Sequence, residues 1–311
     1  MRRRIERITE RENPASAWLD TRTTRQILAI INREDRKVAP AVGKVIPQIA
    51  RAVDMATEAL AQGGRLVYLG AGTSGRLGMV DAAECLPTFG TDRVVALMAG
   101  AAAAFSRPKE GVEDDPGQAV RDLRRIRLSR KDVLVGIAAS GRTPYTLGGL
   151  RYARQVGAKT IAITSNPRGP MRRLADVAIV PTVGPEVVAG STRMKSGTAQ
   201  KLVLNMLSTA TMVRLGRVFS HWMIHLQMTN EKLQKRGRDI LAEATGASSA
   251  AAARTLEESG RDLPAALLML QKGLSKEDAL ECLTAERNTA RALRAAWAKP
   301  AAEKRKRSRC A

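Results

Sequence analysis

The sequence is poor in aromatic residues and in cysteine: Phe, Trp and Tyr make up 3% of its 311 residues, and there are three cysteines. So few aromatic side chains leave little on which nucleotide bases could stack, which argues against nucleic acid binding as the main function. The cysteines are odd in number and show no metal-ligand spacing. We therefore expect Cys85, Cys282 and Cys310 to be free thiols in a reducing compartment.

Long apolar runs are also missing. Hydrophobic residues are 44% of the chain, but no run approaches the roughly 20 residues that span a bilayer. The amino-terminal stretch MRRRIERITER lacks the apolar segment of a secretory signal. We expect a soluble, cytoplasmic protein without a membrane partner.

The chain has an excess of positive charge, with 52 Lys and Arg against 30 Asp and Glu and a net charge of +22. This balance suits a nucleic acid binder, an anionic substrate or a proteome that favours arginine. The basic residues are spread along the chain, apart from the tail EKRKRSRCA at 303–311. We therefore expect no specific nucleic acid partner, and a solvated tail.

Short apolar runs alternate with longer amphipathic segments from residue 65 onward. Strands that are apolar throughout are buried on both faces, and helices between them make their connections parallel. The sequence therefore predicts an α/β fold, a parallel sheet with helices on both faces. The expected strands are RLVYLG (65–70), VVALMA (94–99), DVLVGIA (132–138), KTIAIT (159–164) and DVAIVP (176–181), and PYTLGGLRYARQVG (144–157) is an expected helix.

We divide the chain into four parts. Residues 1–50 form an N-terminal helical segment, and residues 51–245 form the sheet domain. Residues 246–298, rich in Ala, Leu, Glu and Arg, form a small helical appendage, and residues 299–311 form a basic, disordered tail. One main domain with a small addition fits the length of the chain.

Two glycine-rich turns follow expected strands: GAGTSGR after 65–70 and ASGRTPY after 132–138. In an open parallel sheet, ligands bind outside the carboxyl ends of the strands. Hydroxyl groups and free backbone amides at the start of a helix suit a phosphate group. The predicted phosphate-binding residues are Gly72, Thr73, Ser74, Ser140, Gly141 and Thr143.

Other interpretations of these turns are weaker. A dinucleotide-binding turn at Gly70, Gly72 and Gly75 lacks the acidic residue that should close a second strand about twenty residues on, and no Gly-Lys-Ser/Thr of a Walker loop is present. Ordinary helix caps remain an alternative for either turn alone. Two such turns after successive strands favour a shared ligand.

These turns resemble those of sugar isomerase (SIS) domains, which bind phosphosugars. A closer likeness is carried by TERENPASAWLD (9–20), INREDRKV (31–38), GAGTSGRLGMVDAAECLPTFG (70–90), EGVED (110–114), GIAASGRTPY (136–145), GPEVVAGSTRMKSGTAQKLVLNMLST (184–209) and TNEKL (229–233). With these motifs, the sequence over residues 7–245 resembles the N-acetylmuramic acid 6-phosphate etherases. That resemblance implies cleavage of the lactyl ether to N-acetylglucosamine 6-phosphate and D-lactate, without a metal or other cofactor, in cell-wall recycling.

Elimination of this ether needs a base for the proton at C2 and an acid for the departing oxygen at C3. Carboxylates serve in both roles when their surroundings separate their pKa values. By resemblance, Glu84 and Glu113 are the family's acid/base pair, and we assign Glu84 as the acid and Glu113 as the base. Glu84 is expected at the end of the helix after the first turn, among apolar neighbours that raise its pKa. Glu113 is expected on a loop before a helix that Asp115 caps and Pro116 begins.

Several of these residues have simpler alternatives. Glu113, like Glu110 three residues before it, could be a solvated charge. Glu186 either contacts the substrate or forms an ion pair with Arg193 or Lys195. Cys85 is expected to be a packed thiol, because no basic residue adjoins it in sequence.

His221 and His225 are four residues apart on an expected helix, the spacing of the zinc motif H-E-x-x-H. Trp222 stands directly after His221, where that motif has its glutamate, so we expect no metal. The histidines and the stretch AGAAAAFSRPKEGVED both depart from the family pattern.

By resemblance to SIS proteins we expect a homodimer that binds a small phosphosugar, with the segment 190–217 as a candidate packing face and with each site open to residues of the partner. Two other functions stay open. The related glucokinase regulatory protein of animals shares the architecture and only binds, so a phosphosugar-responsive regulator is one alternative. An aldose-ketose phosphosugar isomerase is the other. Both glutamates are present, which favours an enzyme over a sensor.

Overall fold

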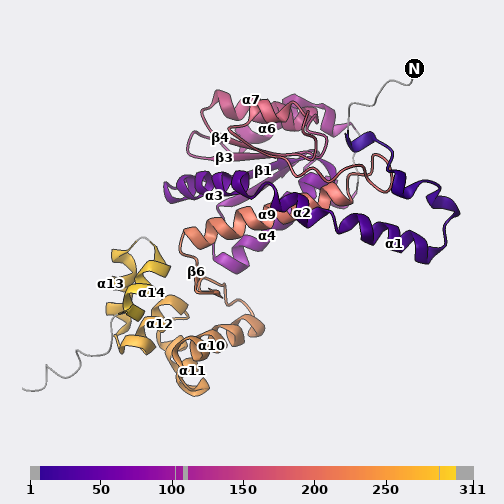
Figure 1. Ribbon diagram of the computed structural model, residues 1–311. Helices are drawn as coiled ribbons and strands as arrows, with labels where there is room; N and C mark the ends of the chain where they lie inside the picture. Colours follow the sequence, from indigo (N-terminus) through magenta and orange to yellow (C-terminus); the bar gives the residue numbers. More distant parts are fainter. Residues whose placement is uncertain (1–7, 102, 108–110, 287, 299–311) are drawn as a thin grey trace, which may run out of the picture. The chain divides into compact units, whose positions relative to one another are not determined.

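The computed structural model describes residues 8–101, 103–107, 111–286 and 288–298. The chain divides into two compact units (Figure 1). The first, which we call the sheet unit, contains Met1–Glu84 and Asp92–Thr211. The second, the helical unit, contains Cys85–Thr91 and Met212–Ala311. Each unit is described by itself below.

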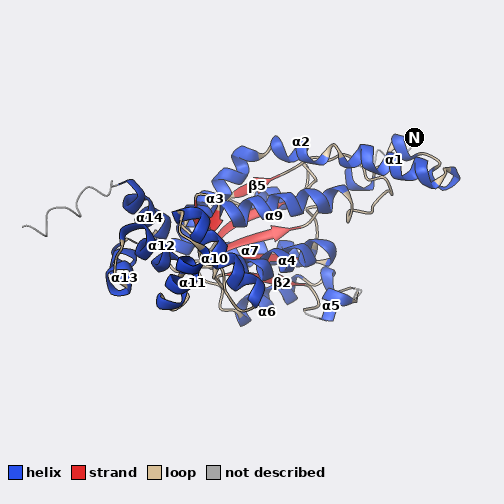
Figure 2. Cartoon of the chain, turned by 90° about the horizontal axis from the view of Figure 1, so that it is seen from below, coloured by secondary structure: helices blue, strands red, loops and turns tan. Residues whose placement is uncertain are grey.

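In the described part of the sheet unit, five parallel strands form one sheet with the order β2-β1-β3-β4-β5 (Figure 2). Strands β1 and β3 are buried along their whole length, as their apolar sequences predict. The predicted α/β fold is confirmed, and each strand begins and ends within two residues of its expected bounds. The strands are β1 Leu66–Gly70, β2 Val94–Met98, β3 Val133–Ile137, β4 Lys159–Ile163 and β5 Val177–Ile179.

Helices cover both faces of the sheet. Because successive side chains of a strand point to opposite faces, Val67 and Leu69 pack in one cluster with side chains of α6 (Pro116–Arg125) and α7 (Pro144–Gln155). Tyr68 points the other way and lies against Gly78 of α4 (Gly72–Phe89). Helix α3 (Ile46–Ala61) contacts β1, β3 and β5. In Figure 1, α6 and α7 lie on one side of the strands and α3, α4 and α9 (Lys195–Arg214) on the other.

Shorter elements lead into this core and connect its parts. Helix α1 begins after Thr23, which forms a capping box with Gln26, so a local signal fixes its start. The other elements of the sheet unit are η1 Ile8–Glu10, η2 Pro14–Ser16, η3 Leu19–Thr21, α1 Thr24–Asp35, α2 Val38–Gly43, α5 Ala103–Ser106, η4 Val112–Asp114 and α8 Met171–Leu174.

The helical unit has its own apolar core, in which Leu241 and Leu256 are buried together with Leu267 and Leu293. Leu241 belongs to α10, so this helix groups with the C-terminal helices, whereas the boundary at residue 245 expected from the sequence assigns it to the sheet domain. Residues 299–311, including Cys310 and the predicted disordered tail, lie outside the described residues. The elements are β6 Val218–Phe219, β7 Trp222–Met223, α10 Glu231–Thr245, α11 Ser249–Glu258, α12 Leu263–Lys272, α13 Lys276–Ala285 and α14 Thr289–Ala298.

The prediction of a helix that contains His221 and His225 is wrong. Strands β6 and β7 pair as an antiparallel hairpin, and Ser220 adopts a positive φ of 54° at its turn. His221 lies in that turn and His225 lies just after β7, so the two do not share a helical face. The His225 ring nitrogen Nε2 lies 3.2 Å from Thr289 Oγ1, and burial lowers the His225 pKa to about 4.

Two further findings concern the described residues only. None of their helices is both long and apolar enough to cross a bilayer. Cys85 is buried and Cys282 is exposed, and neither forms a disulfide within the described residues.

Candidate functional site

The first glycine-rich turn joins β1 directly to α4. Gly72 has a positive φ of 53°, a conformation that favours glycine. A Cβ on Gly75 would lie 2.8 Å from the carbonyl oxygen of Gly70, so only glycine lets the helix begin so close to the strand. Ser74 is 8% exposed, and its hydroxyl donates a hydrogen bond to Gln200 Oε1 at 2.9 Å. The first amides of α4 have no partner within the helix and are available to an anion.

The second turn joins β3 to α7. Pro144 is the first residue of α7, as predicted, and Thr143 stands at the cap position without making a capping hydrogen bond through its side chain. The hydroxyl of Thr143 is therefore not used for the ordinary capping role. Gly141 has a φ of 66°, and a Cβ there would lie 2.8 Å from Thr164 Oγ1. Ser140 Oγ accepts a hydrogen bond from the amide of Arg142 at 3.2 Å.

Residues after β4 support the second turn, and the sequence analysis missed them. Asn166 Nδ2 donates to the carbonyl oxygen of Ser140 at 2.9 Å. Thr164 Oγ1 donates to the carbonyl oxygen of Ala139 at 3.0 Å. A polar Thr-Ser-Asn run directly after an apolar strand was the available signal, because the carboxyl ends of parallel strands meet at one edge of the sheet.

The fold brings the two turns together. Strands β1 and β3 are neighbours, and Gly70 at the end of β1 pairs with Ile137 at the end of β3. Adjacent strands lie about 4.8 Å apart. The hydroxyl groups and helix starts of both turns therefore face one region beyond the sheet.

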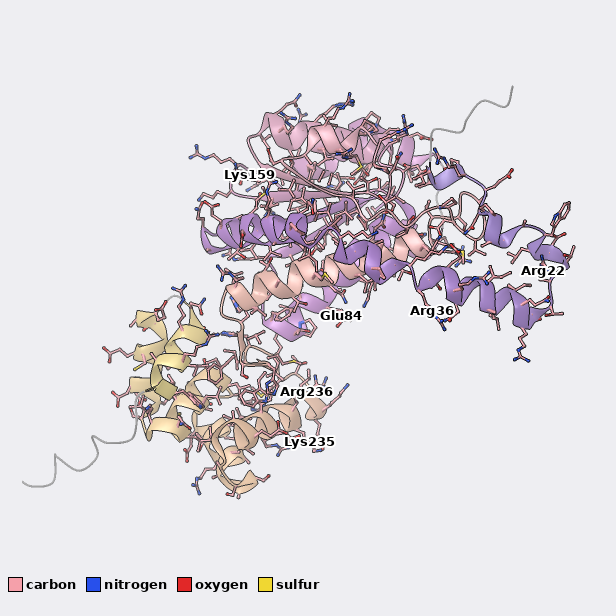
Figure 3. The ribbon with its side chains drawn as sticks, viewed as in Figure 1. Arg22, Arg36, Glu84, Lys159, Lys235 and Arg236 are labelled. Carbon is pink, nitrogen blue, oxygen red and sulfur yellow. The ribbon has the colours of Figure 1, made fainter. Side chains whose placement is uncertain are left out.

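Glu84 lies on α4, ten residues after Ser74 and so about 15 Å further along the helix axis. Helix α4 does not end there but continues to Phe89. The Glu84 side chain is exposed on the surface of α4 (Figure 3), so the described residues do not bury it in the apolar surroundings that we expected.

Glu113 lies in η4, which packs against α7, the helix that begins at the second turn. Its neighbour Val112 packs against the core of the sheet unit, while Glu113 itself is exposed. Asp115 caps α6 and Pro116 begins it, as predicted: Asp115 Oδ1 accepts the amides of Gly117 and Gln118 at 2.8 and 3.0 Å. Glu110 lies outside the described residues.

Arg76 links the two segments that carry these glutamates. It belongs to α4, and its guanidinium donates to the carbonyl oxygens of Ala104 and Phe105 at 2.8 Å each. Those carbonyls belong to α5, the helix that precedes η4 in the chain. Arg76 therefore ties the helix of Glu84 to the segment that leads to Glu113.

Glu186 holds the start of α9. Its two carboxylate oxygens accept the amides of Lys195 at 3.0 Å and Ser196 at 2.9 Å. Neither expected side-chain ion pair forms within the described residues, because the Lys195 ammonium group instead binds Glu34 at 2.7 Å. A buried carboxylate at a helix N-terminus is stabilised by the free amides and the helix dipole.

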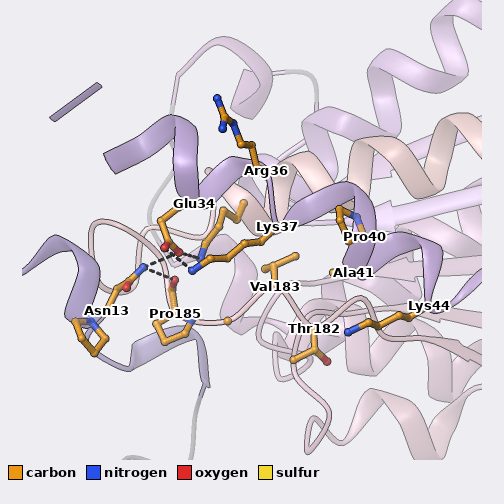
Figure 4. Close-up of a pocket in the computed structure, with 13 residues that line it drawn as sticks. Asn13, Glu34, Arg36, Lys37, Pro40, Ala41, Lys44, Thr182, Val183 and Pro185 are labelled. Atoms are coloured by element: carbon orange, nitrogen blue, oxygen red, sulfur yellow. Dashed lines mark hydrogen bonds and ion pairs between the residues drawn. The ribbon is translucent and has the colours of Figure 1, made fainter. Parts of the chain in front are cut away.

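Glu34 and Lys195 form a buried ion pair, each 1% exposed, that the sequence analysis did not predict. Asn13 Nδ2 and Lys37 Nζ also donate to the Glu34 carboxylate, at 2.9 and 2.5 Å (Figure 4). The hydrogen bonds from these two lysines and Asn13 outweigh burial and lower the Glu34 pKa to about 2. The pair borders a pocket of about 670 Å³, next to the segment Thr182–Pro185 that follows β5.

Known proteins match this chain over nearly its whole length. The family model of the SIS domain matches residues 116–210, and that of the glucokinase regulatory protein N-terminal SIS domain matches residues 48–154. The N-acetylmuramic acid 6-phosphate etherase of Edwardsiella ictaluri (strain 93-146) is 53% identical over 282 residues, 90% of this chain and 94% of the relative. The chain belongs to the N-acetylmuramic acid 6-phosphate etherase family.

A second member of the etherase family, from Yersinia pestis (strain Pestoides F), is 53% identical over 278 residues, 89% of this chain and 94% of the relative. Both alignments are longer than the span from 7 to 245, so the likeness to etherases continues into the C-terminal helices. Among solved structures, a phosphoheptose isomerase from Francisella tularensis is 17% identical, covers 61% of this chain and 98% of its own, and has a TM-score of 0.48.

Proposed function

We propose that this protein cleaves the D-lactyl ether of N-acetylmuramic acid 6-phosphate to N-acetylglucosamine 6-phosphate and D-lactate. The observation that carries this proposal is membership of the etherase family at 53% identity along nearly the whole chain. The reaction is a step in the recycling of cell-wall amino sugars, and we place it in the cytoplasm.

The 6-phosphate is held by the paired turns. We assign this role to Ser74, Ser140 and Thr143, with Thr73, Gly72 and Gly141, which belong to the two turns after β1 and β3. The amide of Gly141 donates to the carbonyl oxygen of Ala138 at 3.0 Å, so it is the other amides of the turns that remain for the phosphate. Free amides at two helix starts favour an anion there. The net charge of +22 also favours the approach of a phosphorylated substrate.

The chemistry is elimination followed by addition of water. In the open-chain aldehyde the carbonyl acidifies the proton at C2, and Glu113 removes it. Glu84 gives a proton to the lactyl oxygen as the bond at C3 breaks, because an alkoxide leaves poorly. Water then adds to the resulting double bond. No metal or other cofactor takes part.

We also propose that the protein is a homodimer whose second copy contributes to each site. Glu84 is exposed and lies about three helical turns along α4 from the first glycine-rich loop. A surface from another chain is therefore needed to shield this general acid from water. Val80 on α4 and Met206 on α9 are exposed apolar residues that such a copy would cover.

Glu186 caps α9 in the free chain, and any substrate contact from it would have to use the same carboxylate.

Mixing two inactive variants tests which chain supplies Glu84. Equal amounts of Glu84→Gln and Glu113→Gln, unfolded and refolded together, give about one intact site in four if the partner supplies Glu84. Refolding each variant alone is the control. No recovered activity would mean that both glutamates act in one chain.

Two alternative functions make different predictions. The match to the glucokinase regulatory protein domain favours a binder as the second candidate, but a sensor has no need of an acid/base pair. An isomerase would use a base at C2 and leave the ether intact.

The deciding experiment is incubation with N-acetylmuramic acid 6-phosphate in water labelled with heavy oxygen, followed by mass spectrometry. Etherase activity by elimination gives free lactate and heavy oxygen on the sugar. Binding without release of lactate would contradict the proposal and favour the regulator. A ketose product that retains the lactyl group would favour the isomerase.

A further inference from the structure

Helix α9 places a glutamine against the first turn, and half of its amide has no partner. Gln200 is 1% exposed, and its Oε1 accepts the hydrogen of the Ser74 hydroxyl at 2.9 Å. The Gln200 nitrogen Nε2 is buried and makes no hydrogen bond within the described residues. Buried donors are nearly always paired, because an unpaired one is unfavourable. The free protein therefore holds an unsatisfied donor beside a residue of the proposed phosphate site.

The position of Gln200 follows from how α9 packs on α4. Gly197 lies three residues earlier, on the same face of α9. A Cβ there would lie 3.4 Å from Thr73 Cγ2, in ordinary contact. One face of α9 thus lies on both hydroxyl residues of the first turn, Thr73 and Ser74.

A second contact keeps the two helices in register. Asp81 of α4 accepts hydrogen bonds from Tyr68 of β1 at 2.8 Å and from Ser208 of α9 at 3.1 Å. Figure 1 shows α4 and α9 running alongside each other below the sheet. Gln200 is therefore held beside Ser74 by the packing of three elements.

The hydrogen bond runs in the wrong direction for phosphate. A serine hydroxyl has one hydrogen, and a phosphate dianion offers only acceptors. While Ser74 donates to Gln200, it presents lone pairs to the ligand. If the Gln200 amide group flips, Nε2 takes the place of Oε1 and donates to Ser74 Oγ. The hydroxyl hydrogen of Ser74 is then available to a phosphate oxygen. Hydrogen bonds in such a chain strengthen one another.

We infer that Gln200 is a positioning residue of the phosphosugar site. Its amide group flips when phosphate binds at the first glycine-rich turn. The flip directs the Ser74 hydroxyl to the phosphate and gives a partner to Gln200 Nε2, which is unsatisfied in the free protein. This inference rests on the proposed function only in placing the phosphate at that turn.

The test is calorimetric titration with N-acetylglucosamine 6-phosphate, the proposed product. Gln200→Met keeps the length of the side chain and removes both polar atoms. We expect it to weaken binding about fivefold, because the bound state loses the one neutral hydrogen bond from Nε2 to Ser74 Oγ that orients the Ser74 hydroxyl. Gln200→Glu can only accept from Ser74 and should weaken binding further. Because Gln200 acts through Ser74, adding Gln200→Met to Ser74→Ala should cause no further loss.

Thr211→Val is the matched control. Thr211 is also on α9, is fully buried and has a hydroxyl without a partner within the described residues, but it lies three turns from Gln200. Its replacement should leave affinity unchanged. Thermal unfolding of each variant separates binding from stability. Gln200→Met removes the unpaired Nε2 donor and also the acceptor of the Ser74 hydroxyl, two effects of opposite sign, so we expect little change in the Tm.

Three results would overturn the inference: unchanged affinity in Gln200→Met, a further loss of affinity in the double variant, or a lower Tm with normal affinity. With N-acetylmuramic acid 6-phosphate as substrate, the effect of Gln200→Met should fall on KM rather than on kcat. Wild-type protein that binds the sugar phosphate without releasing lactate would refute the etherase proposal and leave this inference standing. Failure of the wild type to bind it would refute both.

Discussion

The buried Glu34–Lys195 pair makes a quantitative prediction about stability. We consider Glu34→Gln, which keeps the shape of the side chain and removes its charge. The Lys195 ammonium group, 1% exposed, would then face an amide in place of a carboxylate. Breaking a buried pair by removing one partner is strongly unfavourable, because the remaining charge is left without its counterpart.

The lowered pKa of Glu34 sets the magnitude. Its change from 4.5 to about 2 corresponds to about 3 kcal/mol of stability. Because the folded-state pKa is lowered, this contribution is complete above about pH 4.5 and is lost as the pH falls through about 2. The wild type and Glu34→Gln should therefore differ by about 3 kcal/mol at pH 7, and the difference should shrink in acid.

The assay is urea unfolding of the whole protein at pH 7 and at pH 3. Hydrogen exchange, measured in peptides from α1 and from the start of α9, reports the unfolding of the sheet unit. Lys37→Met is the control, because Lys37 binds the same carboxylate but its side chain is 55% exposed, and an exposed pair contributes about 0–1 kcal/mol. A difference below about 1 kcal/mol for Glu34→Gln at pH 7, or one that does not change with pH, would refute the reasoning.

Four shorter predictions concern the site. Glu84→Gln should lower turnover by at least roughly a hundredfold and keep affinity for N-acetylglucosamine 6-phosphate; near-normal turnover would remove Glu84 from the mechanism. Ser140→Ala should weaken that affinity in calorimetry with the fold intact, and an unchanged value would contradict the phosphate site. Gly141→Ala should lower the Tm, since its φ is 66° and the new Cβ would approach Thr164 Oγ1 to 2.8 Å; an unchanged Tm would contradict this geometry. A chelator should leave turnover unchanged, whereas a loss that zinc restores would implicate a metal.

Much of the fold could be predicted from the sequence because the signals are local. The strand bounds follow from short apolar runs that are buried on both faces. The start of α6 follows from Asp115 and Pro116, whose roles depend only on the next few residues. The two turns could be placed beside each other because parallel strands present their carboxyl ends at one edge. The family could be predicted from the resemblance to etherases, because that resemblance depends on sequence motifs and on no tertiary contact.

One helix prediction failed, and the partner of another helix could not be assigned, because sequence patterns do not show what packs against a segment. The spacing of His221 and His225 fits a helix, but the chain forms a hairpin there. Leu241 could pack with the sheet or with the C-terminal helices, and only the formed core shows that it packs with the helices. Periodicity shows that a face is apolar and does not show which apolar face covers it.

What the sequence alone determined is the family, the order of strands and helices along the chain, and the residue types at the ends of two strands. What only the tertiary structure decided is the set of partners of those residues. Ser74 meets Gln200 across 126 residues of chain, and Lys195 meets Glu34 across 161. The Lys195 charge is paired with Glu34, so Glu186 is left to cap α9. The reason is physical: a local motif fixes backbone conformation within a few residues, whereas burial of polar groups requires partners that only the packing of helices on the sheet brings within hydrogen-bonding distance.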